Sequence, residues 1–387
     1  MRYVFIDDST LAYDGYTPMR RAVGGQEKAV VSLAAALQER GHEVKVLNHV
    51  SYAHMADGAY YVPFGDGQAP RSADVVIALR KPQLMGLMRS VTHRLLWVMG
   101  DPAYLKATIN EPLWESFAAS LLFIGENQKR AYAGKVRSVV LGVGVRSAYF
   151  KPEPSSDIAA DVYGIPYSVE EEEARAKARA EAEAAAAAAE PVPPEIPPPH
   201  AVVTTHPLQG LAWLVDLWTT QIHPQVPAAR MSVYSAVLSK GLRGGEVPAN
   251  IAPILEQVKA AADANVVVVD PLSDSGMNDV YRKSRVHLYP GDAQDFACWT
   301  LAESQTAGLP AVARPLGGAD ERIDNGESGY LVPDAAAFAN VAVQILSNDD
   351  VYRNLSMAAG DVRRRKVWAT AAEKLDAFVA ALPPTQT

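Results

Sequence analysis

The chain has 387 residues, of which 49% are hydrophobic, and a formal net charge of −8 at pH 7. That length allows two domains of ordinary size, and the acidic balance argues against a nucleic-acid-binding surface. A single cysteine, Cys298, excludes an internal disulfide, and no apolar run has signal-peptide character or reaches the ~18 residues that span a membrane. We therefore expect a cytoplasmic protein.

The first 150 residues alternate short apolar runs with helical patterns. The runs RYVFID, EVKVLNH, DVVIAL, LLWVMG, LLFIG and SVVLG predict strands. Between the first two, apolar residues recur with a helical period at Val30, Leu33, Ala34 and Leu37. Strand alternating with helix predicts a parallel sheet covered by helices on both faces.

Residues 78–94, ALRKPQLMGLMRSVTHR, mix basic with apolar side chains. The pattern favours an ordinary helix of the domain. The alternative is a surface that makes weak peripheral contact with a membrane, through the basic and apolar residues Arg80, Lys81, Arg89, Arg94, Leu84, Leu87, Met88 and Val91.

Residues 168–200 are low in complexity and contain few large apolar side chains. From Glu170 to Glu195 there are eight glutamates against Arg175, Lys177 and Arg179, a net charge of 3 − 8 = −5. The Ala/Glu run favours a solvated helix, and the proline cluster after it favours an extended form. A semi-rigid spacer or insertion is the simplest interpretation, and a docking segment for a partner is the alternative.

The second half repeats the alternation. AVVTT, RMSVYSA, NVVVVD, VHLYP, PAVAR and YLVP predict strands, so the chain is expected to be an α/β protein with two Rossmann-like domains. We assign residues 1–150 to the first, 151–200 to the junction, 201–365 to the second and 366–387 to a closing helix. Ligands of such sheets bind beyond the carboxyl ends of the strands, which predicts a site in the cleft between the domains. Trp213 and Trp218 are expected in the core rather than as platforms for a sugar.

The stretch DFACWTLAESQTAGLPAVARPLGG, residues 295–318, carries the main chemical signal. Asp295 is expected in a loop that follows a strand, and Glu303 in the first turns of the next helix, facing the cleft. Carboxylates there can accept hydrogen bonds from vicinal hydroxyls, and a Gly317-Gly318 backbone can approach phosphates closely. Taken singly, Glu303 could be a helix-dipole acid and Asp295 a turn residue.

The same stretch resembles the E-x7-E motif of retaining, GT-B-fold glycosyltransferases of family 4, also called glycosyl transferases group 1. Asp295 holds the first acidic position and Glu303 the second, and AGLPAVARPLGGADERIDNGESGYLV resembles the run that follows in the family. Two further segments, GGQEKAVVSLAAALQERGHEVKVL and GVGVRSAYFKP, look like the family's amino-terminal and junction motifs. The resemblance implies two domains that face each other across a cleft.

The family implies a role for each matching residue. A nucleotide sugar would lie against the second domain, with Glu303 on its ribose and Asp295 and the backbone of Phe296 and Ala297 on its sugar. Gly24, Gly25, Gly317 and Gly318 would approach the diphosphate, although Gly24-Gly25 alone could be a plain turn before a helix. Transfer would need no metal and no cofactor, because fixed donors would stabilise the leaving group.

The loop WVMGDP resembles the family's Trp-x-His-Asp loop. Asp101 matches its acid, and we include Asp101 among the catalytic candidates. Gly100 stands where the family has histidine and cannot offer a side-chain hydrogen bond.

The family's phosphate-binding arginine and lysine are also replaced. The matching run, VVTTHPLQG, has Thr204 or Thr205 near the arginine position and Gln209 at the lysine position. His206 and Arg314 are the nearest candidates to compensate, though His206 could be an ordinary loop histidine and Arg314 a surface cation.

Two hypotheses of different classes follow. The first is an active transferase that moves a sugar from a nucleotide diphosphate to a glycan or lipid-linked acceptor, in cell-surface polysaccharide or lipopolysaccharide biosynthesis. The second is a fold relative without catalysis that serves as a nucleotide-binding or scaffold subunit. The retained acids and glycines favour the enzyme, and the missing cations favour the scaffold.

Overall fold

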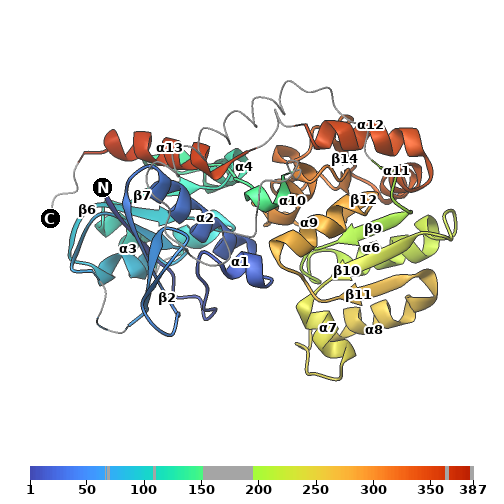
Figure 1. Ribbon diagram of the computed structural model, residues 1–387, viewed down its shortest axis with the longest axis horizontal. Coiled ribbons are helices and arrows are strands. Elements are labelled where there is room, and N and C mark those ends of the chain that lie inside the picture. The colour runs from blue at the N-terminus through green and yellow to red at the C-terminus, as the bar shows by residue number, and fades with distance from the viewer. Residues whose placement is uncertain (66, 68–69, 108–109, 151–194, 362–365, 384–387) are drawn as a thin grey trace, which may run out of the picture.

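The structure is a computed structural model that describes residues 1–65, 67, 70–107, 110–150, 195–361 and 366–383. It has two α/β lobes side by side, the first blue to green and the second yellow-green to orange in Figure 1. Each lobe has its own sheet, which confirms the predicted fold class. The predicted spacer falls almost entirely outside the described residues.

The first lobe is built on an eight-stranded sheet in the order β3-β4-β2-β1-β5-β6-β7-β8. All neighbouring strands pair in parallel except β3 and β4. The strands are β1 (Arg2–Ile6), β2 (Glu43–Asn48), β3 (His54–Ala56), β4 (Ala59–Pro63), β5 (Ser72–Leu79), β6 (Ser90–Trp97), β7 (Ser120–Phe123) and β8 (Ser138–Val140). The helices are α1 (Thr17–Arg20), α2 (Gly25–Glu39), α3 (Glu111–Ser116) and α4 (Glu126–Tyr132), with 3-10 turns η1 (Pro82–Leu87), η2 (Pro102–Lys106) and η3 (Ser147–Tyr149).

The second lobe has a six-stranded parallel sheet in the order β11-β10-β9-β12-β13-β14. Its strands are β9 (His200–Val203), β10 (Arg230–Tyr234), β11 (Val266–Val269), β12 (Val286–Tyr289), β13 (Ala311–Ala313) and β14 (Gly329–Leu331). Its helices are α6 (Leu211–Leu217), α7 (Ala236–Leu242), α8 (Ala252–Ala260), α9 (Asp274–Arg282), α10 (Trp299–Thr306), α11 (Ala335–Ser347) and α12 (Asp349–Ala359), with short turns η5 (Trp218–Ile222), η6 (Ala262–Ala264) and η7 (Ala319–Glu321). Trp218 is fully buried in this core, as predicted.

Both sheets change winding direction at a strand pair near the middle. In the first sheet β2 lies on one side of β1 and β5 on the other, and in the second β10 and β12 flank β9 in the same way. The connections leave such a pair in opposite directions, so a crevice forms at the carboxyl ends of the two strands. The segments after β1, β5, β9 and β12 are therefore where a ligand site is expected.

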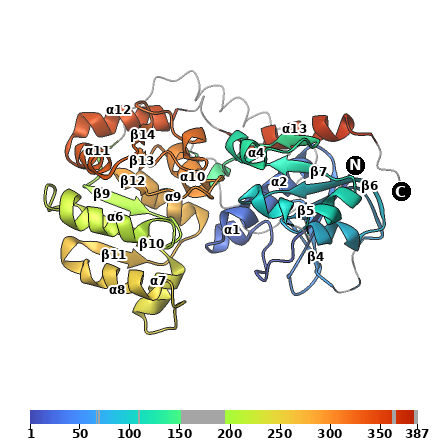
Figure 2. The same cartoon turned by 180° about the vertical axis from the view of Figure 1, so that it is seen from behind.

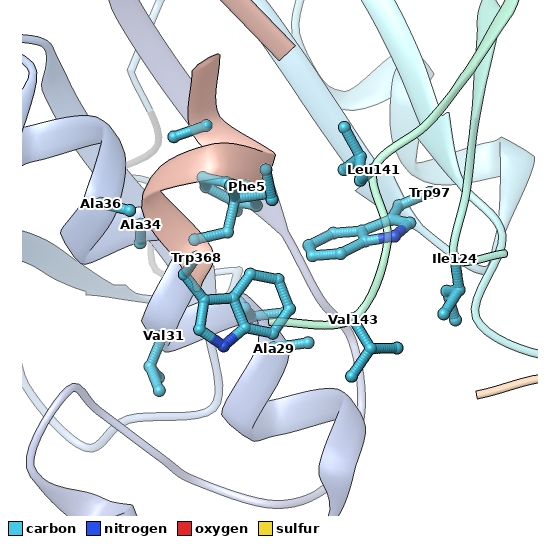
Figure 3. Close-up of a cluster of buried hydrophobic side chains, with 14 of the residues drawn as sticks. Phe5, Ala29, Val31, Ala34, Ala36, Trp97, Ile124, Leu141, Val143 and Trp368 are labelled. Atoms are coloured by element: carbon cyan, nitrogen blue, oxygen red, sulfur yellow. The ribbon is translucent and has the colours of Figure 1, made fainter. Parts of the chain in front are cut away.

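The last helix, α13 (Trp368–Ala380), returns to the first lobe and lies along it in both views (Figures 1 and 2). It packs against α2, and its Asp376 accepts hydrogen bonds from Tyr3 Oη at 2.8 Å and Arg40 Nε at 2.6 Å. At its start, Trp368 lies beside Trp97 and Phe5 in the core of the first lobe (Figure 3). The end of the chain is thus anchored on the domain where the chain begins.

Residues 78–94 do not form the helix that we predicted. They cover the end of β5, the 3-10 turn η1 and the start of β6, and Leu84, Met88 and Val91 are buried. Pro82 is the first residue of η1, a position that tolerates its missing amide hydrogen, and residues 90–94 belong to the strand β6, which pairs with β5. No helix in the described part of the chain is long and apolar enough to cross a bilayer.

Candidate functional site

The loop after β12 carries the first acid of the motif. Asp295 accepts hydrogen bonds from the hydroxyl of Tyr289 and from the backbone amide of Cys298, the latter at 3.0 Å. Phe296 and Ala297 are buried. The Asp295 carboxylate therefore holds the turn that leads into α10, and we expect contact of Phe296 and Ala297 with a ligand to use their backbone.

Gly317 and Gly318 are required by this loop. A Cβ added at Gly317 would lie 2.1 Å from the carbonyl oxygen of Asp295, and one at Gly318 would lie 2.1 Å from that of Phe296. The amide of Gly318 donates to the Asp295 carbonyl at 2.9 Å. We expected these glycines to admit a phosphate, and the structure gives a different reason for them, the close approach of two protein loops.

The second acid, Glu303, is buried rather than open to the cleft as we expected. It is 7% exposed, and its Oε1 accepts a hydrogen bond from Lys28 Nζ at 2.8 Å. Lys28 lies in the first turns of α2 in the first lobe, three residues after Gly25. The two glycosyltransferase-like segments thus meet across the domain interface, because Glu303 lies on α10 of the second lobe.

Asp274, at the start of α9, extends this contact into a network. It is fully buried and pairs with Lys28 at 2.7 Å and with Arg146 at 2.8 Å. Tyr149 Oη donates to Asp274 Oδ1 at 3.0 Å and accepts from Lys28 Nζ at 2.9 Å. With Glu303, the network holds two carboxylates and two cations, and the charges balance at the point where the domains join.

Burial and the neighbouring charges act in opposite directions on this network. Burial raises the pKa of Glu303, since an ionised carboxylate loses its hydration, and the Lys28 ammonium opposes that rise. For Lys28, burial favours the neutral amine, but Glu303 and Asp274 together outweigh it and raise the lysine pKa. The network therefore holds Lys28 as a cation.

The Gly24-Gly25 pair lies at the amino terminus of α2, as predicted. A Cβ at Gly25 would lie 2.1 Å from the Trp299 side chain, which comes from the first residue of α10. Trp299 also stacks on Trp368 of α13 at a centroid distance of 6.3 Å. Gly25 thus makes room for an aromatic contact between the two domains.

The loop after β9 carries the residues that stand where the family has its phosphate-binding arginine and lysine. Thr204 Oγ1 is hydrogen bonded to His287 Nε2 at 2.9 Å and to Thr300 Oγ1 at 2.7 Å. Burial lowers the pKa of His287 to about 3, so this imidazole is neutral and only orders the threonines. The Thr205 Oγ1 atom is buried without a partner among the described residues, which marks it as a candidate contact for a ligand or a water.

His206, Gln209 and Arg314 lie around the same loop. His206 is exposed, its Nδ1 accepts from the Leu208 amide at 3.3 Å, and Gln209 Oε1 accepts from the His206 amide at 3.3 Å. The Arg314 guanidinium donates to the carbonyls of Pro290 and Gly291, the latter at 3.0 Å, and lies 4.8 Å above the Trp213 ring. The structure therefore brings Arg314 to the carboxyl ends of β9 and β12.

Asp101 follows β6 in the first lobe. Its Oδ1 accepts a hydrogen bond from the amide of Ala103 at 2.9 Å, which caps the turn η2. A Cβ added at neighbouring Gly100 meets no heavy atom within 4 Å, so a side chain is not sterically excluded there.

A polar cluster that we did not predict lies at the same edge of the first sheet. Arg80 donates to Gln26 Oε1 at 3.0 Å and also to Asp7, while Lys81 pairs with Asp8 at 2.6 Å. Each cation thus has its own carboxylate, so the cluster has little net charge.

Lys28, Asp274, Arg146 and Tyr149 were also missed. Lys28 is separated from Glu303 by 275 residues along the chain, so no local spacing indicates the pair. Asp274 follows a serine at the start of a helix and looks locally like a helix-dipole acid. A signal existed for three of them, because Lys28 lies within the amino-terminal motif GGQEKAVVSLAAALQERGHEVKVL, and Arg146 and Tyr149 lie within the junction motif GVGVRSAYFKP.

Comparison with known sequences supports the assignment of the second domain. Residues 201–348 match the family described as glycosyl transferases group 1. A D-inositol 3-phosphate glycosyltransferase of Corynebacterium diphtheriae is 31% identical over 110 residues, which is 28% of this chain and 26% of that protein. A phosphatidyl-myo-inositol mannosyltransferase of Mycobacterium leprae is 28% identical over 125 residues, 31% of this chain and 33% of that one. The matches thus span only about a quarter to a third of these relatives.

Solved structures resemble nearly the whole chain. Sucrose-phosphate synthase from Thermosynechococcus elongatus has a TM-score of 0.66 at 14% identity and covers 98% of both chains. HepE of Anabaena, solved in complex with UDP-glucose, has a TM-score of 0.65 at 14% identity over 99% of this chain and 100% of its own. WaaG, a glycosyltransferase involved in lipopolysaccharide biosynthesis, has a TM-score of 0.62 at 13% identity over 98% of this chain and 100% of its own.

At these identities the structural likeness establishes the fold, and the sequence match establishes the family of the second domain. Residues 201–348 therefore form a domain of the glycosyl transferases group 1 family, within a chain that has the two-domain GT-B fold.

Proposed function

We propose that the protein is a retaining glycosyltransferase that takes a sugar from a nucleotide diphosphate. The observation that carries the proposal is the 2.8 Å contact between Glu303 and Lys28, which joins the two signature segments at the domain interface. The relatives are named as glycosyltransferases, and HepE was solved in complex with UDP-glucose, which supports a nucleotide-sugar donor. We further propose that the reaction needs neither metal nor cofactor, since no Asp-x-Asp follows a predicted strand.

We propose that different groups at the interface bind the ribose, the sugar and the diphosphate of the donor. Glu303 would accept hydrogen bonds from the ribose, and the backbone around Asp295 and Phe296 would contact the sugar. The diphosphate would lie between the amino terminus of α2 and the loop after β9, where backbone amides meet negative charge. Leaving-group charge would then be stabilised by fixed donors, Thr205 among them.

Arg314 is the proposed compensating cation for the diphosphate. It is the arginine that the fold brings to the carboxyl ends of β9 and β12, beside Gly210. Because an ionic contact to phosphate is stronger than a neutral hydrogen bond, Arg314→Gln is expected to weaken nucleoside-diphosphate binding about tenfold, or about 1.4 kcal/mol. Calorimetric titration at rising salt checks this, and the loss should shrink as salt screens the contact.

The matching nucleoside, which lacks phosphates, should bind wild type and Arg314→Gln equally. Arg353→Gln, which removes an exposed partner of Asp350, is the matched control and should bind the diphosphate normally. Equal diphosphate affinity in Arg314→Gln and wild type would exclude Arg314 as the compensating cation.

The acceptor would enter from the first lobe. The segments after β1, β5 and β6 bring hydroxyl-binding groups together, and the Tyr104 Oη and Arg80 Nε atoms are buried without partners among the described residues. Such groups suit the hydroxyls of a glycan or glycolipid, and a cytoplasmic enzyme of surface polysaccharide or lipopolysaccharide synthesis would meet such acceptors. Membrane contact is not part of the proposal, because Leu84, Met88 and Val91 are buried and leave Leu87 as the exposed member of the four apolar residues.

A nucleotide-binding or scaffold role remains the second candidate. The observation that favours it is the loop after β9, where Thr204 or Thr205 and Gln209 stand at the family's cation positions. A protein without catalysis would still bind a nucleotide or keep its domain arrangement, but it would not transfer sugar.

Thermal shift with UDP, GDP, ADP and their glucose and mannose conjugates tests the proposal. A ligand that binds only the folded protein must raise the unfolding midpoint, so we expect at least one of these diphosphates to do so. Release of free nucleoside diphosphate from the bound sugar conjugate then separates the enzyme from the scaffold. If none of the ligands binds, the protein is not a nucleotide-sugar transferase of this donor class.

A further inference from the structure

The ammonium of Lys28 is fixed by three acceptors. Its Nζ donates to Glu303 Oε1 at 2.8 Å and to Tyr149 Oη at 2.9 Å, and it lies 2.7 Å from Asp274 Oδ1. The contacts with Glu303 and Tyr149 use two of the three hydrogens of the ammonium, and the contact with Asp274 is an ion pair. Only 12% of the side chain is exposed, and water therefore competes little for these contacts.

The acceptors of Lys28 are themselves held in place. Arg146 donates to Asp274 Oδ2 at 2.8 Å and to Ser32 Oγ at 3.0 Å, so a residue of the junction fixes the carboxylate from its other side. Asp274 is fully buried, and its rotation would leave a cation unpaired. The position of the Lys28 ammonium is therefore set by residues of both domains.

Glu303 gains its orientation from this arrangement. The hydrogen bond from Lys28 ends at Oε1, and a carboxylate has acceptor positions on both oxygens, so Oε2 stays available to a second donor. A ribose diol needs an ionised carboxylate, because a protonated one has lost part of its acceptor capacity. A buried glutamate tends to lose its charge unless a cation lies within about 4–6 Å.

We propose that Lys28, from the first domain, is a positioning residue for nucleotide binding, which holds Glu303 of the second domain ionised and oriented toward the ribose. The inference rests on the proposed function, because it takes Glu303 as the ribose ligand. It adds that the ribose contact depends on a residue of the opposite domain. Domain arrangement and donor binding are then coupled, since separating the lobes removes the cation from Glu303.

Other titratable groups around Glu303 do not replace Lys28. Asp274 on α9 is a like charge that raises the Glu303 pKa, and Tyr149 on η3 donates its hydroxyl hydrogen to Asp274. Tyr281 on α9 also faces this carboxylate, and burial raises its own pKa, so it stays neutral. His287 on β12 bonds to Ser304 next to Glu303 and is neutral, because burial lowers its pKa to about 3. Lys28 is thus the cation in direct contact with Glu303 among the described residues.

The test is the pH dependence of nucleoside binding in Lys28→Met. The thermal-shift experiment identifies which of UDP, GDP and ADP stabilises wild type most, and the probe is the corresponding nucleoside, uridine, guanosine or adenosine. A nucleoside is used because a phosphate group would itself titrate near pH ~6. Binding requires ionised Glu303 and is lost as pH falls through its pKa. Removing an adjacent cation raises a carboxylate pKa by about 1–3 units, so the midpoint of this loss should move up by about 1–3 pH units.

Two further variants separate positioning from a general structural effect. Lys28→Arg keeps the positive charge and should return the midpoint toward that of wild type. Lys45→Met, which removes a lysine paired with Glu43 at 2.9 Å on β2, is the matched control and should leave the midpoint unchanged. A Lys28→Met midpoint equal to that of wild type overturns the proposal.

Glu303→Gln keeps the test decisive if Lys28→Met does not fold. This variant retains the contact between Lys28 and Asp274, so it should fold, bind nucleoside more weakly and lose the pH dependence. If Glu303→Gln keeps the wild-type midpoint, Glu303 is not the titrating group and the inference fails. Absence of any nucleotide binding by wild type would instead refute the proposed function.

Discussion

Replacing Asp274 with alanine is expected to lower the free energy of unfolding by about 3–5 kcal/mol, because it breaks a buried ion network on one side. Arg146 would lose the carboxylate with which it pairs, Lys28 would keep Glu303, and both cations are largely buried, with 14% and 12% of their side chains exposed. The network joins the two lobes, so we also expect the lobes to separate more easily. Urea denaturation and small-angle scattering measure the two effects.

Asp270→Ala is the matched control for this prediction. Asp270 lies four residues earlier and pairs with Arg243 at 2.6 Å, but its side chain is 52% exposed. Exposed ion pairs contribute little, so the control should leave the urea midpoint within error of wild type. Equal midpoints for Asp274→Ala and Asp270→Ala would show that the interdomain network does not stabilise the fold.

Gly317→Ala is expected to have the second large effect. Gly317 has φ near +60°, which costs an alanine about 1–2 kcal/mol, and the new Cβ would lie 2.1 Å from the Asp295 carbonyl oxygen. Relieving such a clash adds about 1–3 kcal/mol, so the total loss should be about 2–5 kcal/mol. Thermal unfolding measures it, and donor binding should fall as well, because the displaced loop carries Phe296 and Ala297.

Gly326→Ala separates backbone strain from the clash. Gly326 has φ near +82°, and a Cβ there meets no heavy atom within 4 Å, so this variant should lose only the conformational part, about 1–2 kcal/mol. A Gly317→Ala variant no less stable than Gly326→Ala would mean that the two loops move apart at little cost.

The order of strands and helices could be predicted from the sequence because buried parallel strands are continuous apolar runs. Each of the twelve predicted runs overlaps a strand of the structure. The hairpin of β3 and β4 was missed, since its strands are short and mix His, Met and Tyr. Its turn, Asp57-Gly58 with both φ values positive, carries the Asp-Gly signal of a tight hairpin and could have indicated it.

The site was predictable only in part. The positions of Glu303 and the glycine pairs in their loops and helices could be predicted, because short motifs define the order of residues within a loop or helix. The partners of those residues do not follow. Gly25 was expected to face a phosphate and packs against Trp299, and Gly317-Gly318 pack against the Asp295–Phe296 backbone.

The sequence by itself therefore determined two α/β domains, the family of the second domain and the placement of Glu303 early in a helix beyond a strand. Hydrophobic periodicity and turn residues involve only residues close together in the chain, so these features can be predicted from local sequence. The tertiary structure decided that Glu303 is buried against Lys28, that Asp274 joins them, and that Arg314 lies near the β9 loop. Coulomb energy and desolvation depend on distances between groups far apart in the chain, and only the packing of one lobe on the other sets those distances.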